Sequence, residues 1–310
     1  IDVVVVGDAL LIAKAYEELV KNLGSLVEFP DFGTARYVLP MDDGGIFEIE
    51  FATARSEAYN TGSRKPEVAP ATLEQDLSRR DFTVNAMAVP VQWFVDCQGQ
   101  TVEELGKVVI DPFQGCSDIG TKTLRTPLDP DVTFSDDPLR MLRAVRFAAQ
   151  LGFTLPLFIQ EAIFRNRERI KIVSLERVQE ELFKLLATPE PSIGLQLMFN
   201  TKLMHVVLPE ISTLDGVEDV YGHTHKNNLT HTFKVVDNVA IQSKNVWLRM
   251  AGLFHDIGKP ATKQFMPKIG WTFHAHEHVG RKMMNALGRR LRLPNDKIQY
   301  LGKLIRWHLQ

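Results

Sequence analysis

Three acidic residues stand within short apolar runs near the start of the chain. Asp2 opens the run Val3–Val6, and Glu48 and Glu50 alternate with apolar residues in Ile46–Phe51. Residues two apart project from the same face of a strand, so the two glutamates repel each other unless a divalent cation lies between them. A solvent-facing edge strand would also explain this pair taken alone. We therefore expect either a metal-binding sheet face or an ordinary polar one.

A second group of polar residues lies in an otherwise apolar segment, Leu73–Val89. Arg79, Arg80, Asp81 and Asn85 bring two cations, an acid and an amide into seven residues. Guanidinium and amide groups bind phosphate and sugar oxygens, and a carboxylate accepts hydrogen bonds from ribose hydroxyls. A structural salt bridge would account for any one of these residues. The four together favour a nucleotide-binding site.

A third charged group lies in residues 135–147, where we predict the start of a helix. Ser135 or Asp136 is the expected N-cap, and Pro138 falls in the first turn, where its missing N–H costs nothing. Asp137 is followed at a three-residue step by three arginines, Arg140, Arg143 and Arg146. This spacing gives either a solvated ion pair worth about 0.3 kcal/mol or a cluster aimed at a ligand.

The elements that position these residues change type near residue 135. Before it, a helix is predicted over 9–23, and short strands are predicted over 3–6, 25–29, 35–39 and 45–51. After it the pattern is almost wholly helical, with a clear helix over 175–186. The sequence therefore predicts an α+β protein in which a small mixed sheet is followed by helices.

The composition is that of a globular protein with room for two or three domains in 310 residues. No apolar run is long enough to cross a bilayer, so no membrane partner is expected. Cys97 and Cys116 have neither a metal-binding spacing nor the pattern of a disulfide framework. We therefore expect the protein to work in a reducing compartment, the cytoplasm. The net charge of −2 excludes a global basic field, although the basic segment Arg281–Arg306 is compatible with a phosphate-binding face.

Five segments resemble, in the same order, motifs of the class II tRNA nucleotidyltransferase and bacterial poly(A) polymerase family. They are Ile1–Val4, Thr53–Tyr59, Arg79–Met87, Asp111–Phe113 and Asp136–Phe147. The resemblance implies a polymerase-β-like nucleotidyltransferase head followed by an all-helical neck and a helical HD domain. We assign the head to residues 1–126, the neck with the nucleotide-selecting region to 127–188, and the HD-type domain to 189–310.

The resemblance implies metal-assisted nucleotidyl transfer in the head. The family opens its active site with a glycine-rich loop and an Asp-x-Asp pair, of which Asp2 matches the second aspartate. The loop and the first aspartate are missing before Ile1, so we expect the chain as written to be catalytically incomplete. Asp2 and Glu50, with Glu48 as the alternative to Glu50, would hold Mg²⁺ ions that activate a primer 3′-hydroxyl and neutralise a triphosphate.

The nucleotide contacts follow from the same resemblance. Arg80, Asp81 and Asn85 would bind the phosphates and ribose of the incoming nucleotide, with Arg79 in support. The implied substrates are ATP, CTP and the 3′ end of tRNA or another RNA.

Asp137 and Arg140 match the positions at which family members read the base without a nucleic-acid template. Cytosine and adenine present an amino group beside a ring nitrogen, which suit a carboxylate acceptor and a guanidinium donor. Guanine and uracil reverse both polarities. Arg143 and Arg146 would hold phosphates or brace the pair.

All nine histidines lie after residue 204, which indicates separate chemistry in the C-terminal part. His231 on one predicted helix and His255-Asp256 at the end of the next resemble the HD-domain metal phosphohydrolases. His276 and His308 fall where further ligands occur in some of them. Adjacent His and Asp can share one metal where a helix ends, because their side chains converge. The resemblance implies a divalent transition metal at His231, His255, Asp256 and His276.

Three functions stay open from the sequence. The first is addition of CMP and AMP to tRNA 3′ ends. The second is addition of A alone, to tRNA or as poly(A) tails. The third is an HD phosphohydrolase or RNA-binding protein with an inactive head.

Overall fold

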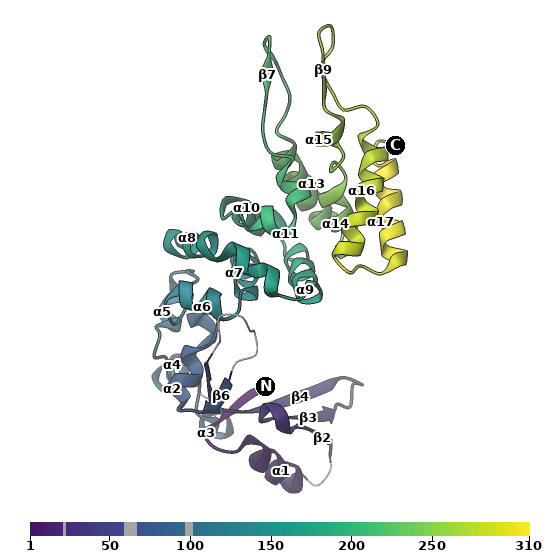
Figure 1. Ribbon diagram of the computed structural model, residues 1–310. Helices are drawn as coiled ribbons and strands as arrows, with labels where there is room; N and C mark the ends of the chain where they lie inside the picture. Colours follow the sequence, from purple (N-terminus) through teal and green to yellow (C-terminus); the bar gives the residue numbers. More distant parts are fainter. Residues whose placement is uncertain (21–22, 59–66, 97–101) are drawn as a thin grey trace. The chain divides into compact units, whose positions relative to one another are not determined.

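The computed structural model describes residues 1–20, 23–58, 67–96 and 102–310 (Figure 1). Tyr59 and Cys97, which entered the sequence analysis, lie outside these ranges. The chain divides into two compact units, residues 1–116 with 126–128 and residues 117–125 with 129–310. The predicted HD-type domain and the predicted neck, apart from residues 127–128, therefore fall within the second unit.

A small mixed sheet forms the first part of the head, as predicted. Its strands lie in the order β1 (Asp2–Val5), β4 (Ile46–Thr53), β3 (Thr34–Pro40) and β2 (Ser25–Phe29). β1 runs parallel to β4, whereas β4, β3 and β2 are antiparallel neighbours. β4 is thus an interior strand, so the edge-strand explanation for its glutamates is wrong.

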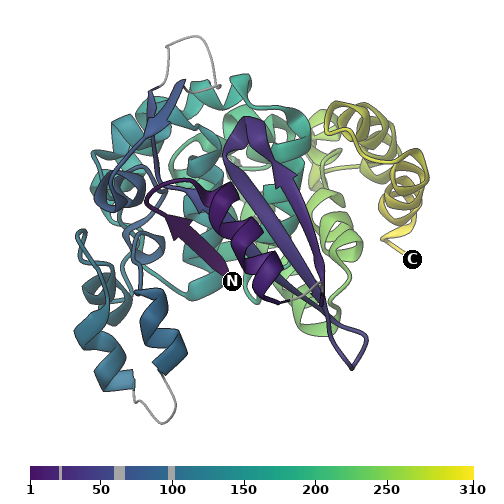
Figure 2. The ribbon, with the colours of Figure 1, turned by 90° about the horizontal axis from the view of Figure 1, so that it is seen from below.

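The helix α1 (Ala9–Leu19) covers one face of this sheet (Figure 2). Asp8 caps it by accepting hydrogen bonds from the backbone N–H groups of Leu10 and Leu11 at 2.9 and 3.3 Å. The core between helix and sheet consists of Ala9, Ala13, Ala35, Tyr37 and Phe51. Side chains alternate across a strand, so the residues next to these core positions project from the opposite face.

The rest of the first unit is built from short elements. They are η1 (Pro30–Phe32), β5 (Arg55–Ala58), β6 (Glu67–Pro70), α2 (Leu73–Ser78), η2 (Thr83–Asn85), α3 (Val91–Asp96), α4 (Val102–Val108) and the start of α5 (Gly115–Gly120). β5 and β6 pair as an antiparallel ribbon. A capping box between Thr72 and Gln75 begins α2 and so fixes the segment that leads into Arg79 and Arg80.

The second unit is helical apart from two short hairpins. Its first helical elements are α6 (Pro130–Asp136), α7 (Leu139–Leu151), α8 (Leu157–Asn166), η3 (Arg167–Ile172), α9 (Leu175–Leu186), α10 (Pro191–Asn200), α11 (Leu203–Val207) and α12 (Pro209–Ser212). The later ones are α13 (Asn228–Gln242), α14 (Val246–Phe254), α15 (Lys259–Thr262), α16 (His276–Arg290) and α17 (Asn295–Trp307). None of the helices in the described ranges is long and apolar enough to cross a membrane.

The hairpins were not predicted from the sequence. β7 (Asp219–Val220) pairs with β8 (His223–Thr224), and β9 (Gln264–Met266) pairs with β10 (Gly270–Thr272). Strands of two or three residues are too short to show an alternation of apolar and polar residues. The sequence analysis therefore assigned both hairpins to a helical domain.

A buried arginine ties the neck to the HD part within this unit. Arg249 of α14 is 4% exposed and donates to the carbonyls of Leu186, the last residue of α9, and Thr188 at 2.7 and 2.8 Å. It also donates to the carbonyls of Ala240 and Ser243 at the end of α13. One guanidinium thus satisfies carbonyl groups at the ends of two helices.

The predicted helix start at residues 135–136 is wrong, since both residues lie in the last turn of α6. Asp129 already caps that helix. Pro138 disfavours a helical conformation in the residue before it, and Asp137 is extended, with φ −129° and ψ 98°. Asp137 Oδ1 then accepts a hydrogen bond from the backbone N–H of Leu139 at 3.2 Å, at the start of α7.

Candidate functional sites

A row of three charged residues crosses the open face of the head sheet. The strand register pairs Asp2 with Glu50, and Glu50 in turn with Arg36. Neighbouring strands lie about 4.8 Å apart, and paired residues project from the same face. The adjacent residues Val3 and Phe51 pack in the core under α1, so the charged row faces away from it. The sheet therefore brings together Asp2 and Glu50, the two predicted metal ligands of the head.

Arg36 forms ion pairs with both glutamates of β4. Its guanidinium contacts Glu50, and it lies 3.7 Å from Glu48. The sequence analysis expected a cation between these carboxylates but missed the arginine that provides one. Within the described residues of the head, no three metal-ligating side chains converge on one point. The register of Glu50, rather than Glu48, opposite Asp2 favours Glu50 as the second acid of the site.

Asp76 of α2 is the centre of the arginine cluster, and the sequence analysis missed it. Its side chain is 1% exposed, and it accepts hydrogen bonds from Arg79 Nη2 and Nε at 2.5 and 3.1 Å. Arg80 Nη2 donates to its other oxygen at 3.2 Å, and the backbone N–H of Arg55 donates at 3.2 Å. An acid three and four residues before two arginines is a readable signal, because such residues are neighbours on a helix.

Arg80, Asp81 and Asn85 lie together after α2. Asp81 is 8% exposed, and its Oδ1 accepts hydrogen bonds from the backbone N–H of Phe82 at 2.9 Å and from Asn85 Nδ2 at 3.2 Å. Arg80 Nε is buried and has no hydrogen-bond partner among the described residues. An unsatisfied buried N–H is costly, which favours a ligand oxygen at this position.

Asp137 has a partner on another helix. Its Oδ2 lies 3.2 Å from Arg177 Nη2 of α9, which is 40 residues further along the chain. The backbone N–H of Arg140 donates to the Asp137 carbonyl at 3.0 Å, so the two predicted base-reading residues stand together at the start of α7. The sequence analysis missed Arg177, which fixes the orientation of the Asp137 carboxylate.

Arg143 and Arg146 lie beside Glu181 of α9. Arg146 Nε is 2.7 Å from Glu181 Oε2, and the two side chains are 7% and 3% exposed. Arg143 lies 4.0 Å from the same carboxylate. Arg146 also donates to Gln150 at 2.6 Å and stacks on the ring of Phe147. A buried, paired guanidinium is not accessible to phosphate, so the geometry supports the bracing role for Arg146 rather than nucleotide binding.

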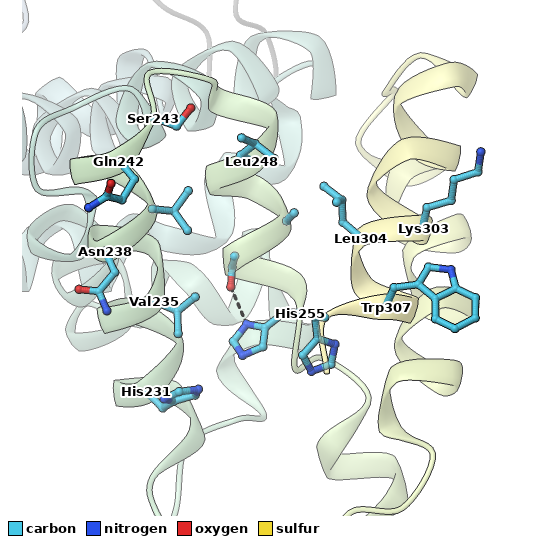
Figure 3. A pocket seen from close by; sticks show the side chains of 14 residues that line it. His231, Val235, Asn238, Gln242, Ser243, Leu248, His255, Lys303, Leu304 and Trp307 are labelled. Carbon is cyan, nitrogen blue, oxygen red and sulfur yellow. Dashed lines mark hydrogen bonds between the residues drawn. The ribbon is translucent and has the colours of Figure 1, made fainter. Parts of the chain in front are cut away.

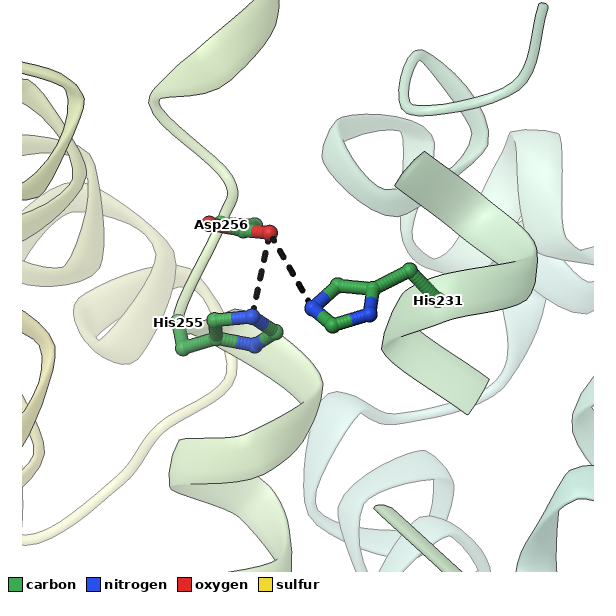
Figure 4. A group of neighbouring side chains, drawn as sticks. All are labelled: His231, His255 and Asp256. Atoms are coloured by element: carbon green, nitrogen blue, oxygen red, sulfur yellow. Dashed lines mark ion pairs between the residues drawn. The ribbon is translucent and has the colours of Figure 1, made fainter. Parts of the chain in front are cut away.

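Four histidine side chains of the second unit converge on Asp256. Figure 4 shows two of them, His231 and His255, beside the Asp256 carboxylate. His255 Nε2 lies 3.0 Å and His231 Nε2 3.9 Å from Asp256 Oδ2. His276 Nε2 and His308 Nε2 lie 3.4 and 3.7 Å from Oδ1. The structure thus brings together the four predicted ligands of the HD part and also His308. Helix α14 ends at Phe254, which lets the adjacent His and Asp side chains converge.

Backbone carbonyls fix the rings of three of these histidines. The Nδ1 atoms lie within 2.8 Å of carbonyl oxygens in the pairs His255–Gly252, His276–Phe273 and His308–Ile305. A carbonyl only accepts, so Nδ1 carries a proton and Nε2 is the ring atom that faces Asp256. A protonated Nε2 donates to the carboxylate, and a deprotonated Nε2 can bind a metal. Facing lone pairs need a proton or a metal between them. This donor set, with its backbone support, fits a divalent transition metal.

Asp256 is the buried anion of this cluster, with a side chain 1% exposed. Burial raises its pKa, but hydrogen bonds from the neighbouring histidines and Lys259 outweigh burial and hold the pKa well below its usual range. The hydrogen bond to Asp256 raises the pKa of His276, whereas burial lowers the pKa of His231 and His308. Lys259 Nζ lies 2.6 Å from Oδ2. The site thus sets one buried carboxylate, paired with the Lys259 ammonium, among the converging ring nitrogens.

A cavity of about 850 Å³ opens beside the cluster, between α13, α14 and α17 (Figure 3). His231, His255 and His308 line it together with Lys303 and Trp307. The His231 side chain is 46% exposed. An organic group can therefore reach the histidine cluster from this cavity.

Three family models match successive parts of the chain. The poly A polymerase head domain matches residues 1–125, and the probable RNA and SrmB-binding site of polymerase A matches residues 152–214. The HD domain matches residues 228–310, which include the whole histidine cluster. The chain belongs to the tRNA nucleotidyltransferase and poly(A) polymerase family. The predicted family is confirmed.

Curated relatives of this family member include multifunctional CCA proteins. That of Vibrio parahaemolyticus is 35% identical over 232 residues, which are 73% of this chain and 52% of the relative. That of Pseudomonas fluorescens is 32% identical over 261 residues, which are 80% of this chain and 58% of the relative. The chain spans little more than half the length of these relatives.

Solved structures confirm the predicted α+β fold. A tRNA-processing enzyme in an apo form is 25% identical with a TM-score of 0.63, and the match covers 99% of this chain and 72% of that one. A tRNA nucleotidyltransferase complexed with a primer tRNA and an incoming ATP analogue is 24% identical with a TM-score of 0.63, over 98% of this chain and 74% of that one.

Proposed function

We propose that this family member is a template-independent nucleotidyltransferase that adds CMP and AMP, from CTP and ATP, to the 3′ end of tRNA. The observation that carries the proposal is the strand register that sets Asp2 beside Glu50 on the open face of the head sheet. The multifunctional CCA proteins among the relatives support the choice of reaction. We assign the reaction to the cytoplasm, in line with the cysteine usage.

Asp2 and Glu50 are the proposed holders of divalent ions in the head. Carboxylate oxygens are preferred ligands of Mg²⁺. When bound, Mg²⁺ activates the primer 3′-hydroxyl and neutralises the triphosphate. The Arg36 guanidinium contacts Oε1 of Glu50, and it would become available to the phosphates if metal replaced it at this carboxylate.

The cluster after α2 is the proposed nucleotide site. Asp76 fixes one end of the Arg80 guanidinium, and the buried Nε of Arg80 is a donor suited to a phosphate oxygen. Asp81 and Asn85, already hydrogen-bonded to each other, would bind the ribose hydroxyls. The ion pair of Arg79 with Asp76 supports its predicted supporting role.

Asp137 and Arg140 are the proposed base-reading pair. The Asp137 carboxylate accepts from the amino group of cytosine or adenine, and Arg140 donates to the adjacent ring nitrogen. Guanine and uracil would set an N–H against the guanidinium and a carbonyl against the carboxylate. Arg177 keeps the Asp137 carboxylate oriented at 3.2 Å.

The test uses the full-length protein with tRNA that lacks its CCA end, Mg²⁺ and one labelled nucleotide at a time. CMP should be added first, and AMP should follow when CTP is also supplied. Addition of A without C would favour an A-only enzyme. No incorporation of any nucleotide would favour a chain whose head is inactive.

A second function, metal-dependent hydrolysis of phosphate esters, is favoured by the convergence of histidine Nε2 atoms on Asp256. A bound divalent transition metal supplies Lewis acidity and an activated water. His231, His255, Asp256 and His276 would hold it, and Lys303 in the adjoining cavity would attract the phosphate. Hydrolysis of a chromogenic phosphate ester that depends on added Mn²⁺ or Ni²⁺ and is lost in His255→Ala is the expected result. Hydrolysis that survives a chelator would exclude this function.

A further inference from the structure

We propose that Arg169 of η3 is a positioning residue for base selection. It acts through Asp137, because it fixes the backbone of the junction between α6 and α7 from which the Asp137 side chain projects. The inference rests on the proposed base-reading pair. It adds a residue that lies outside the segments resembling family motifs and that sets where the pair stands.

The junction between α6 and α7 leaves one backbone carbonyl without its helical partner. In a continuous helix, the Ser135 carbonyl would accept a hydrogen bond from the N–H of Leu139. That N–H donates instead to Asp137 Oδ1 at 3.2 Å. The break in the helix therefore creates an orphan acceptor at Ser135, which another group has to satisfy.

The backbone of the junction holds itself only weakly. The N–H of Asp137 donates to the Thr133 carbonyl at 3.5 Å, which is the long limit for a hydrogen bond. Pro138 has no N–H to offer to the last turn of α6. The position of Asp137 thus depends on side chains that reach the junction from other elements.

Arg169 supplies the missing donor. Its Nη2 donates to the Ser135 carbonyl at 2.9 Å, across 34 residues of sequence. A guanidinium beside the last turn of a helix also faces the negative end of the helix dipole. Arg177 of α9 meanwhile holds the Asp137 carboxylate at 3.2 Å. The backbone before Asp137 and its side chain are therefore held from two separate elements, η3 and α9.

The bonding of Arg169 is incomplete for a residue with a purely structural task. Its Nε is buried and has no hydrogen-bond partner among the described residues. An unsatisfied buried N–H costs free energy, so Arg169 should contribute less to stability than Arg249, which donates to four carbonyls. We therefore expect loss of Arg169 to change base selection more than the stability of the fold.

A misplaced Asp137 should weaken the contact with the base and leave the other nucleotide contacts intact. A side chain that reads a base has to stay within about 0.5 Å of its productive position. The phosphates and the ribose are assigned to the cluster after α2, which Arg169 does not hold. The advantage of cytosine over uracil should therefore fall, whereas transfer at saturating CTP should change little.

The test is single-nucleotide incorporation by the full-length protein into tRNA that lacks its CCA end. Arg169→Ala should reduce the discrimination of CTP against UTP about 5-fold through KM, with kcat within about 2-fold of the wild type. Arg169→Lys should restore part of the discrimination, because an ammonium can also donate to the Ser135 carbonyl. In the Asp137→Ala background, Arg169→Ala should have no further effect on discrimination.

Arg167→Ala is the matched control. Arg167 lies on the same η3 segment and donates to the Phe164 carbonyl in the last turn of α8 instead of to the junction. It should leave discrimination unchanged. Hydrogen–deuterium exchange over residues 133–140 reads the junction itself and should be faster in Arg169→Ala than in Arg167→Ala. If circular dichroism shows that Arg169→Ala does not fold, Arg169→Met, which keeps the apolar stem, takes its place.

The outcomes separate this role from the proposed function. Wild-type discrimination in a folded Arg169→Ala protein would overturn the positioning role and leave nucleotide transfer standing. An equal loss in Arg167→Ala, or an additive loss in the double variant with Asp137→Ala, would also overturn it, since Arg169 would then not act through Asp137. No incorporation of any nucleotide by the wild type would overturn both proposals.

Discussion

The head and the HD part organise their carboxylates in opposite ways. On the head sheet, the Glu50 side chain is 47% exposed and paired with Arg36. In the HD part, Asp256 is 1% exposed and faces ring nitrogens whose orientation is fixed by backbone carbonyls. The ring nitrogens of the HD centre are thus already oriented by the fold. On the head sheet, ions would take the place of the Arg36 guanidinium at Glu50, which suits the proposed site where metal and triphosphate bind together.

The largest expected effect is the loss of nucleotide transfer when Asp2 of the head is replaced. Asp2→Ala should reduce transfer of every nucleotide by about 10³-fold or more, since it removes a carboxylate that holds the reacting metal. Mn²⁺ binding in the HD part should not change. Asp42→Ala, in the exposed turn between β3 and β4, is the control. Transfer that persists in Asp2→Ala at more than a tenth of the wild-type rate would remove Asp2 from the site.

The next effect concerns Asp76, a buried carboxylate of the head that holds arginines rather than metal. Asp76→Asn removes the negative charge between Arg79 and Arg80. The KM for the nucleotide should therefore rise about 10-fold. The free energy of unfolding should fall by about 3 kcal/mol. Steady-state kinetics and denaturant unfolding measure the two changes. Glu74→Gln, at an exposed position of the same helix, should change neither. A loss of stability without a rise in KM would make Asp76 purely structural.

A smaller effect is expected on the choice of base. Asp137→Ala should reduce discrimination against UTP and GTP by roughly 10- to 100-fold, because one well-placed contact pair contributes about 1–3 kcal/mol. Arg177→Ala should relax the same discrimination less, since it only orients the carboxylate. Single-nucleotide incorporation with each of the four triphosphates measures both. Unchanged selectivity in Asp137→Ala would contradict the base-reading role.

The smallest effect tests the exchange of guanidinium for metal directly. Arg36→Ala frees Glu48 and Glu50, so Mn²⁺ should bind the head about 5-fold more tightly in the absence of nucleotide, as expected for a half-exposed ion pair worth up to about 1 kcal/mol. The titration is done in a His231→Ala/His308→Ala background, which isolates the head. Weaker Mn²⁺ binding in Arg36→Ala would mean that Arg36 orders the acids instead of competing with ions.

Local signals in the sequence predicted much of the fold. The strand at Ser25–Phe29 and the helix at Leu175–Leu186 have the predicted bounds, because apolar periodicity and turn residues mark both ends. The helix start near residue 135 was misplaced because an earlier cap at Asp129 competes with it. Tertiary structure, rather than local preference, decided that boundary.

The candidate sites likewise contain residues that the sequence predicted and partners that it did not. Motif residues such as Asp2, Glu50 and the HD pair were predicted, because their types and order are visible in the chain. Their partners Arg36, Asp76 and Arg177 were not. Arg36 and Arg177 act across 14 and 40 residues of sequence, where only the fold brings the side chains together.

The central claim is that nucleotide transfer belongs to the head and is independent of the HD centre. The most direct measurement is incorporation of labelled CMP and AMP into tRNA lacking its CCA end by wild type, Asp2→Ala and Asp256→Asn full-length proteins. The account predicts C and A addition by the wild type and by Asp256→Asn at similar rates, and none by Asp2→Ala. Loss of addition in a folded Asp256→Asn protein, or addition by Asp2→Ala, would contradict it.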